Sequence, residues 1–234
     1  MPADRRVTVS GSFPRPSEAM IARFRGLGSA TVGEALAGRN LMSPDIRPVF
    51  VGCSVVGPAT TCIVEPFDNL SMHLALQVAR PGDVIVIATR LRGSTGLWGG
   101  LTTASAVARG IAGVVADGGV RDTADIARAR FPVWAAAITP RGASKQAFGS
   151  VNQPVSCGGV VVAPGDLVIG DDDGVVVVPQ DLIATVITAA ESRATKETAL
   201  RTKLSAGATP FEHLGLHETL RAIGVEIQEP DGSI

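Results

Sequence analysis

The sequence has almost no net charge and no long hydrophobic run. Its 234 residues carry 21 Lys and Arg against 22 Asp and Glu, a formal net charge of −1. This balance lacks the basic excess that typifies proteins of nucleic acids or membrane surfaces, so we expect neither partner. The apolar runs are far shorter than a membrane-spanning helix, and the first residues, MPADRRVTVSGSF, lack the apolar segment of a secretion signal. We therefore expect a cytoplasmic protein.

Cysteine and several familiar site motifs are also scarce. The three cysteines, Cys53, Cys62 and Cys157, are scattered, which indicates buried apolar side chains in a reducing compartment. No GxGxxG follows a strand, and there is neither a Walker loop nor a serine nucleophile elbow. Asp171–Gly174 lacks the spacing and closing glutamate of a calcium loop, and His213 and His217 lack a third metal ligand. We expect a turn at the first motif and no metal at the histidine pair.

The informative stretch is Trp98–Asp125, which reads WGGLTTASAVARGIAGVVADGGVRDTAD. We predict a buried strand over 83–88, a helix over 101–108 capped by Thr102 or Thr103, and a second strand over 114–117. A strand–helix–strand unit makes its two strands parallel, so the loops that leave them share one edge of the sheet. The loops at 99–100 and 118–121 should therefore face one crevice.

The residues of these loops indicate how the crevice works. Gly99 and Gly100 allow a ligand to approach the backbone, and a helix start offers N–H groups to an anion. Arg121 carries a planar fork of donors that fits a carboxylate, and Asp122 is a hard oxygen ligand suited to Mg²⁺. Together they suit a small oxo-acid held on a divalent cation. Each also has a plain structural interpretation: Asp122 as the N-cap of a helix over 123–130, Arg121 as a surface ion pair, and the glycines as turn residues.

The chain carries GGVRD after a buried VVADG strand, and WGGL-T-A and GI-G come before that strand. In these motifs the chain resembles the RraA-like family. The resemblance covers roughly residues 31–225. That family includes 4-hydroxy-4-methyl-2-oxoglutarate/4-carboxy-4-hydroxy-2-oxoadipate aldolases and RraA regulators of ribonuclease E. It implies an α/β fold, an α/β/β/α sandwich of the swivelling phosphohistidine-domain type, with a C-terminal helical extension.

The resemblance to the aldolases also implies a function and its residues. The function is cleavage of a 4-hydroxy-2-oxo acid to pyruvate through a metal-stabilised enolate, with oxaloacetate decarboxylase side activity. Asp122 would ligate Mg²⁺ (or Mn²⁺), and Arg121 would hold the keto oxygen. Glu197, from a neighbouring subunit, would position water for proton transfer. The substrate-binding positions would be Gly99, Gly100, Leu101, Thr102, Asn69 and Arg121.

One position departs from the aldolase pattern. The aldolases usually carry an acid where this chain has Gly100. The absence of that acid puts the proton transfer and the identity of the aldol substrate in question. It leaves intact the residues that would serve the pyruvate-enolate part of the reaction. Decarboxylation of oxaloacetate needs no base for an alkoxide and should tolerate the change better. The alternative function is a non-catalytic regulator that binds ribonuclease E or another protein. The segment after Pro179, with its Glu197, favours the aldolase branch. A related lyase or hydratase is a third option.

The whole chain divides into an N-terminal arm (residues 1–16), an α/β core (17–180) and a C-terminal helical extension (181–234) that packs on a neighbouring subunit of a homotrimer or homohexamer. We predict helices over 17–25, 31–36 (capped by Thr31), 69–78, 181–205 (capped by Asp181) and 214–223, and strands within 46–65 (broken near residues 57–58), 132–138 and 155–179. His73 is expected to be a packed or solvated side chain rather than a ligand, and its place one turn after Asn69 is compatible with a position near the crevice. Lys145 is expected to be solvated, with recognition of a second carboxylate as its alternative role.

Overall fold

The computed structural model describes residues 9, 11–92 and 95–225. The predicted arm over residues 1–16 therefore lies partly outside the described residues. The chain forms two compact units, residues 1–191 and 192–234, and the division falls inside helix α6 (Ile183–Ser205). None of the helices in the described ranges is long and apolar enough to cross a membrane.

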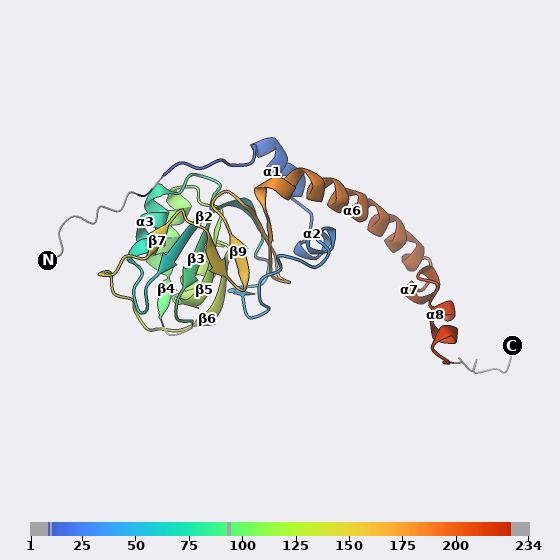
Figure 1. The fold of residues 1–234 in the computed structure, drawn as a ribbon. Helices are drawn as coiled ribbons and strands as arrows, with labels where there is room; N and C mark the ends of the chain where they lie inside the picture. The colour runs from blue at the N-terminus through green and yellow to red at the C-terminus, as the bar shows by residue number, and fades with distance from the viewer. Residues whose placement is uncertain (1–8, 10, 93–94, 226–234) are drawn as a thin grey trace. The chain divides into compact units, whose positions relative to one another are not determined.

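A mixed sheet forms the centre of the first unit (Figure 1). Within the described residues it has nine strands, and a separate two-stranded ribbon joins β8 and β9. Strands β2, β3, β5 and β6 run parallel, β4 pairs parallel with β5, and the other pairings are antiparallel. In sheet order the strands are β1 (Arg47–Pro48), β6 (Val133–Ile138), β5 (Gly113–Val120), β3 (Val84–Thr89), β2 (Val55–Val64), β10 (Leu167–Gly170) and β11 (Val175–Val178), with β4 (Gly96–Trp98) beside β5, β7 (Ser150–Val151) beside β2, and the ribbon of β8 (Val155–Cys157) and β9 (Val160–Val162).

The sheet curls so that its two halves face each other. Trp134 lies on β6 and Gly170 on β10, several strands apart in the sheet, yet a Cβ at Gly170 would lie 2.8 Å from the Trp134 ring. The Trp134 indole Nε1 also donates to the Asp171 carbonyl at 2.9 Å. One hydrophobic core fills the inside of the curl, between the parallel strands, β10, β11 and the ribbon. The result is a mixed α/β fold with a curled sheet.

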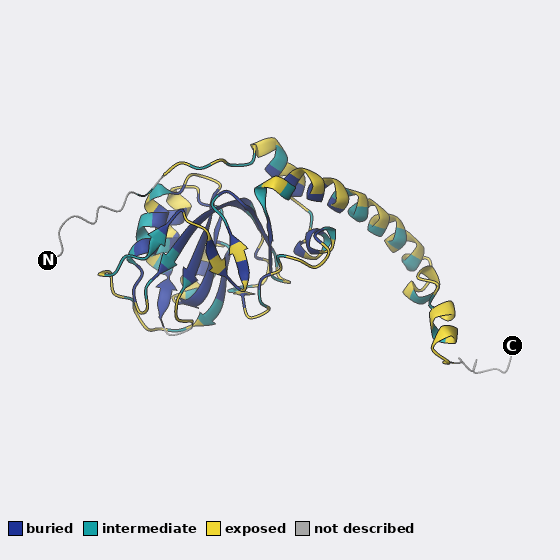
Figure 2. Cartoon of the chain, viewed as in Figure 1, coloured by how far each residue is buried: buried dark blue, intermediate teal, exposed yellow. Residues whose placement is uncertain are grey.

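Helices cover the outside of the curl in two groups. The helices α3, α4 and α5 enclose a second core against the parallel strands, and α1, α2 and the start of α6 enclose a third against β10 and β11. Figure 2 shows the strands as the most buried part of this unit. The helices are α1 (Glu18–Phe24), α2 (Ser29–Ala35), α3 (Leu70–Val78), α4 (Gly100–Ala108), α5 (Thr123–Arg128), the 3₁₀ helix η1 (Gln180–Leu182), α6, α7 (Pro210–His213) and α8 (Leu216–Ala222).

The predicted strand–helix–strand unit is confirmed. Strands β3 and β5 pair in parallel, with α4 between them in the chain. Their apolar, β-branched runs are buried on both faces, as is typical of parallel strands. Two details differ: the short strand β4 precedes α4, and Gly118 and Gly119 continue β5 instead of forming a loop. A Cβ at Gly119 would lie 2.6 Å from the Thr95 carbonyl oxygen, so these glycines allow a close approach of backbones within the sheet.

The predicted break near Gly57 and Pro58 is wrong, because β2 runs through both residues. Pro58 pairs only with Leu167 of β10, and the ladder to β3 begins one residue later, at Ala59. Proline is tolerated here because its missing N–H falls where the strand has one neighbour.

Three predicted caps are also wrong. Helix α2 begins two residues before Thr31 and has Gly28 as its N-cap, α4 has Gly99, and Asp181 lies inside η1. Capping patterns are local signals, whereas tertiary contacts set these starts: the Ser29 backbone N–H, for example, donates to Asp171 at 2.6 Å.

A buried ion pair attaches the segment before α1 to the start of β3. The Arg15 guanidinium donates to both oxygens of Asp83, at 2.9 and 2.8 Å, and their side chains are 14% and 1% exposed. We predict that Arg15→Met lowers the free energy of unfolding by about 3 kcal/mol in urea denaturation, because it removes the counter-ion of a buried carboxylate. Thr60 and the Arg80 N–H still donate to Asp83 in this variant, at 2.8 and 2.9 Å. The control is Arg25→Met, which removes the exposed pair with Glu18 and should barely change stability. Equal stability losses in the two variants would contradict the prediction.

Candidate functional site

A cavity of about 150 Å³ opens at the ends of the parallel strands, where the two loops were expected to meet. Six of the eight predicted site residues line it: Asn69, Gly99, Leu101, Thr102, Arg121 and Asp122. They come from the start of α3, the turn from β4 into α4, and the turn from β5 into α5. The prediction that these loops share one crevice is therefore confirmed.

The turn into α4 is closed by its own hydrogen bonds. The Gly99 N–H donates to Thr102 Oγ1 at 3.0 Å, and that hydroxyl donates to the Gly99 carbonyl at 2.8 Å. Thr103, the other predicted cap, instead accepts a hydrogen bond from the Trp98 indole at 2.8 Å. Both threonines thus stabilise the turn from inside the helix, and Gly99 holds the cap position.

The Asp122 side chain crosses from one loop to the other. Its backbone occupies the N-cap position of α5, but its carboxylate makes no hydrogen bond with that helix. Instead, Oδ2 accepts a hydrogen bond from the Gly100 N–H at 3.0 Å. The residue has φ 55° and ψ 41°, a left-handed conformation that is uncommon for residues other than glycine and recurs at functional sites. The N-cap interpretation is therefore right for the backbone and wrong for the side chain.

Glycines make room for the Arg121 side chain beside this carboxylate. The Arg121 Nε lies 3.5 Å from Asp122 Oδ2, and both side chains are about two-fifths exposed, at 43% and 41%. A Cβ at Gly99 would lie 2.7 Å from Asp122 Oδ2 and 3.0 Å from Arg121 Cγ, and at Gly142 it would lie 3.3 Å from Arg121 Nη1. The Arg121 ion-pair interpretation thus holds only within the site, since its partner is the neighbouring Asp122.

The other end of the cavity carries polar atoms without partners. Asn69 donates through Nδ2 to the Leu97 carbonyl at 3.0 Å, which leaves Oδ1 buried with no hydrogen bond among the described residues. His73 Nε2 is likewise buried and lacks a partner in the described part of the chain. Burial, and then the positive charge of Lys145, lower the pKa of His73 below its usual value. All three side chains line the cavity, so His73 and Lys145, which we expected to be packed or solvated, face the site.

The acidic residue that lines the cavity, Asp122, fits a hard divalent cation. Mg²⁺ is often held by one or two carboxylates with waters, and Asp122 is a half-exposed carboxylate at the cavity. No group of three or more His, Cys, Asp or Glu gathers as a metal site within the described ranges, so a closed protein cage is not the arrangement here. Asp122 is therefore the residue that would hold the cation.

Sequence reasoning missed a second carboxylate near this position. A Cβ at Gly100 would lie 3.0 Å from Asp125 Oδ2, so the Asp125 side chain extends toward the space above this glycine. Asp125 is one turn after Asp122, in the first turn of α5, and also pairs with Arg128 at 2.8 Å. The signal in the sequence that could have identified Asp125 is its spacing of three residues from Asp122.

Glu197 belongs to the second unit, on α6. Its carboxylate pairs with Arg193 Nε at 2.8 Å, one helical turn earlier. The two side chains are partly exposed, at 42% and 34%, so this is an ordinary ion pair between neighbours on one helix. A role at a neighbouring subunit's site stays a prediction.

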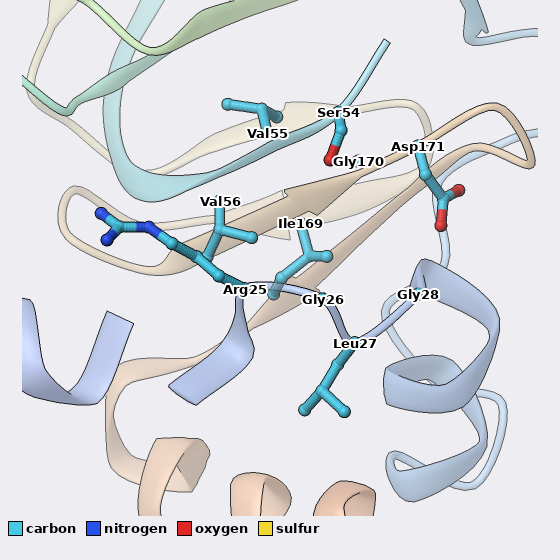
Figure 3. Close-up of a pocket in the computed structure, with 10 residues that line it drawn as sticks. All are labelled: Arg25, Gly26, Leu27, Gly28, Ser54, Val55, Val56, Ile169, Gly170 and Asp171. Carbon is cyan, nitrogen blue, oxygen red and sulfur yellow. The ribbon is translucent and has the colours of Figure 1, made fainter. Parts of the chain in front are cut away.

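A larger cavity, of about 500 Å³, lies elsewhere in the first unit (Figure 3). It is formed by the loop between α1 and α2 and by the starts of β2 and the β10–β11 turn. Its acid, Asp171, already accepts hydrogen bonds from the Ser29 N–H and hydroxyl, both at 2.6 Å, and its Arg25 pairs with Glu18. None of the predicted site residues lines it, so we assign the site to the smaller cavity.

Known proteins are similar to this chain in sequence. Residues 29–177 match the family model described as "RraA-like: Aldolase/RraA". A protein of Halalkalibacterium halodurans, provisionally named a 4-hydroxy-4-methyl-2-oxoglutarate aldolase, is 38% identical over 160 residues, 68% of this chain and 76% of its own. A Thermus thermophilus protein with that aldolase name is 33% identical over 113 residues, 48% of this chain and 69% of its own.

Solved structures match as well. Streptomyces coelicolor RraAS2, described as an unusual member of the RNase ES inhibitor RraA protein family, superposes with a TM-score of 0.73 at 30% identity. That match covers 81% of this chain and all of the other. An uncharacterised Pseudomonas syringae protein gives a TM-score of 0.76 at 28% identity, covering 84% of this chain and 97% of the other.

Proposed function

Because the chain belongs to the RraA-like family, we propose that it is a divalent-metal-dependent aldolase that cleaves a 4-hydroxy-2-oxo acid to pyruvate. The observation that carries this proposal is the Asp122 carboxylate, held by the Gly100 N–H beside the Arg121 guanidinium at one cavity. A carboxylate for a hard cation and a planar cation for a developing oxyanion are the two groups that enolate chemistry requires.

Each group at the cavity would have its own role in the reaction. The bound cation, Mg²⁺ or Mn²⁺, would act as a Lewis acid on the 2-oxo group. The backbone from Gly99 to Thr102, at the start of α4, would bind the substrate's carboxylate. Arg121 would donate to the keto oxygen. As the C3–C4 bond breaks, its electron pair moves toward that oxygen to form the pyruvate enolate, which Arg121 stabilises. The C4 hydroxyl loses its proton to become a carbonyl, and the enolate gains a proton at C3.

The far end of the cavity suits a second acid group on the substrate. Lys145 supplies a positive charge there. Asn69 Oδ1 and His73 Nε2 have no hydrogen-bond partner within the described part of the chain, so hydrogen-bonding groups of a ligand would satisfy them. A dicarboxylic 2-oxo acid such as 4-hydroxy-4-methyl-2-oxoglutarate meets these needs: its distal carboxylate would pair with Lys145, and its hydroxyl would donate to Asn69. Oxaloacetate, which is also dicarboxylic, would be decarboxylated through the same enolate.

Several finer assignments belong to this proposal. Glu197 of a neighbouring subunit would position water for proton transfer, which requires a homotrimer or homohexamer with sites at subunit interfaces. The extension over residues 181–234 would then pack on that neighbour, after a core over 17–180. The fold would be an α/β/β/α sandwich of the swivelling phosphohistidine-domain type. A cytoplasmic location accords with a soluble metabolite as substrate.

The test is pyruvate release from 4-hydroxy-4-methyl-2-oxoglutarate and from oxaloacetate, with Mg²⁺ and with EDTA, after subtraction of spontaneous oxaloacetate decay. We expect metal-dependent release from both. Release of pyruvate from oxaloacetate alone would support the site for the enolate and would exclude 4-hydroxy-4-methyl-2-oxoglutarate as the substrate. That outcome would agree with the missing acid at Gly100. Absence of release from both would refute the proposed activities.

Lys145→Met provides a sharper test of the substrate's second carboxylate. We expect KM for both dicarboxylic substrates to rise about tenfold, because one charge-assisted hydrogen bond is lost, with kcat nearly unchanged. The matched control is Lys196→Met, which removes a lysine of the second unit. An unchanged KM in Lys145→Met would assign the distal carboxylate to other residues.

A second candidate function is regulation of a ribonuclease. It is favoured by the likeness to Streptomyces coelicolor RraAS2, whose description places it among RNase ES inhibitor proteins. It predicts no turnover and direct binding to ribonuclease E or another protein, which titration with the purified nuclease would detect. The cavity with Arg121 and Asp122 has no role in that function, which is why we rank the aldolase first.

A further inference from the structure

The most heavily hydrogen-bonded acid beside the cavity is Asp68, which does not line it. The residue is 1% exposed. One carboxylate oxygen accepts from the Leu70 N–H at 2.8 Å. The other accepts from the Ser144 hydroxyl at 2.5 Å and from the N–H groups of Gln146 and Ala147 at 2.6 and 3.2 Å. A single carboxylate therefore joins two segments that are more than 70 residues apart in the chain.

These bonds surround Lys145. Its neighbours on both sides, Ser144 and Gln146, bind the same Asp68 oxygen. The backbone adds to the junction: the Asn69 N–H donates to the Ser144 carbonyl at 3.0 Å, and the Ser144 N–H donates to the Phe67 carbonyl at 2.8 Å. By contrast, among the residues that the structure describes, the Lys145 ammonium itself makes only a long contact, 3.4 Å, to the Ala143 carbonyl. The position of Lys145 at the cavity is thus set by its backbone, which Asp68 holds together with the two backbone hydrogen bonds at Ser144.

We propose that Asp68 is a positioning residue that sets the affinity for the substrate's second carboxylate by holding Lys145 at the cavity. The inference rests on the proposed function for the identity of the ligand. Asp68 does not line the cavity, and we expect it to act on Lys145 through the backbone of residues 144–147. Burial pushes the pKa of Asp68 up, but its hydrogen bonds from Gln146, Ser144, Leu70 and Ala147 outweigh burial and lower the pKa to about 2. The Asp68 carboxylate is therefore negatively charged at every working pH.

The first experiment measures binding by calorimetry with Mg²⁺ present, using 2-oxoglutarate and pyruvate as probes. The two differ in the presence of a second carboxylate. Asp68→Asn keeps the side-chain size and an acceptor for Leu70, but places an amide where three donors converge. We expect the affinity for 2-oxoglutarate to fall about tenfold and the affinity for pyruvate to stay within about twofold. An equal loss for both probes would overturn the inference, because it would mean general damage to the site.

The second experiment asks whether Asp68 acts through Lys145. If it does, the double variant Asp68→Asn/Lys145→Met binds 2-oxoglutarate no more weakly than Lys145→Met alone. Additive losses would overturn the inference. Asp166→Asn is the matched control, because Asp166 is a buried acid that binds the N–H groups of Ala163 and Gln180 away from the cavity. We expect this control to bind both probes as the wild type does.

Two further outcomes separate this inference from the proposed function. If the wild type releases no pyruvate but the binding cycle is non-additive, the aldolase proposal fails and the positioning role stands. If the wild type binds 2-oxoglutarate no more tightly than pyruvate, the positioning role fails whatever the activity. Should Asp68→Asn not fold, Ser144→Ala removes one hydrogen bond to the Asp68 carboxylate. We expect this variant to lose about threefold in affinity for 2-oxoglutarate and none for pyruvate. An unchanged affinity in that variant would overturn the inference.

Discussion

Asp122→Asn is expected to abolish metal-dependent pyruvate release, with a loss of at least about 10²–10³-fold in kcat. The substitution replaces a hard anionic ligand with a neutral amide, which Mg²⁺ binds poorly. Asparagine is the right choice because it tolerates the left-handed conformation of this position, whereas alanine would add backbone strain. Its amide oxygen can still accept the hydrogen bond from Gly100. The change therefore tests the charge of the ligand and leaves the turn intact.

The measurement pairs pyruvate-release rates with calorimetric titration of Mg²⁺ and Mn²⁺. Asp122→Asn should lose both activity and metal binding while its urea denaturation curve stays close to the wild type. Asp181→Asn, an exposed acid in η1, is the control and should keep both. Wild-type turnover in Asp122→Asn would contradict the assignment of Asp122 as the metal ligand and, with it, the proposed metal-dependent aldolase activity.

Arg121→Lys is expected to lower kcat about 10²-fold or more while metal binding stays intact. The guanidinium presents several donors in one plane, whereas an ammonium is a point charge that cannot reproduce that fork. The cavity is shaped for the longer group, because Gly96, Gly99 and Gly142 all leave space against the Arg121 side chain. Since the negative charge on the keto oxygen grows as the C–C bond breaks, the loss should fall on kcat more than on KM.

The same two assays distinguish this variant from Asp122→Asn. Arg121→Lys should bind Mg²⁺ normally, and it should also lose affinity for oxalate, a planar mimic of the pyruvate enolate. Arg109→Lys is the control, because Arg109 binds the Gln77 carbonyl on the outside of the fold. A raised KM with an unchanged kcat would show that Arg121 only binds substrate and does not stabilise the enolate.

The sequence alone was sufficient to predict the parallel unit and the meeting of the two loops at one cavity. The apolar, β-branched runs of β3 and β5 could be buried only in a sheet covered on both faces, and the helix between them required the strands to be parallel. That arrangement places the residues after β4 and β5 at one edge, so Gly99, Arg121 and Asp122 were brought together by topology. The family resemblance, carried by GGVRD in this context, is confirmed by the match over residues 29–177.

The tertiary structure decided how individual side chains are used. Thr31, Thr102 and Asp181 all have good capping chemistry, yet none occupies the N-cap position of its helix. Asp122 looked like a cap from its neighbours in sequence, but its carboxylate turns toward Gly100 on another loop. Local patterns predict which groups are available, whereas the partner of each group depends on what folding brings near it.

The polar end of the cavity shows the same limit most clearly. His73 and Lys145 each appeared ordinary in sequence, since a lone histidine on a helix and a lysine in a polar loop are usually packed or solvated. Folding places both at one cavity, and the buried Asp68 holds the two segments together across more than 70 residues. Periodicity and turn chemistry act over a few residues and cannot encode that meeting. The sequence by itself therefore determined the parallel strand–helix–strand unit, the crevice and its Arg121–Asp122 pair. Only long-range packing decided how the rest of the sheet curls and which further side chains line the cavity.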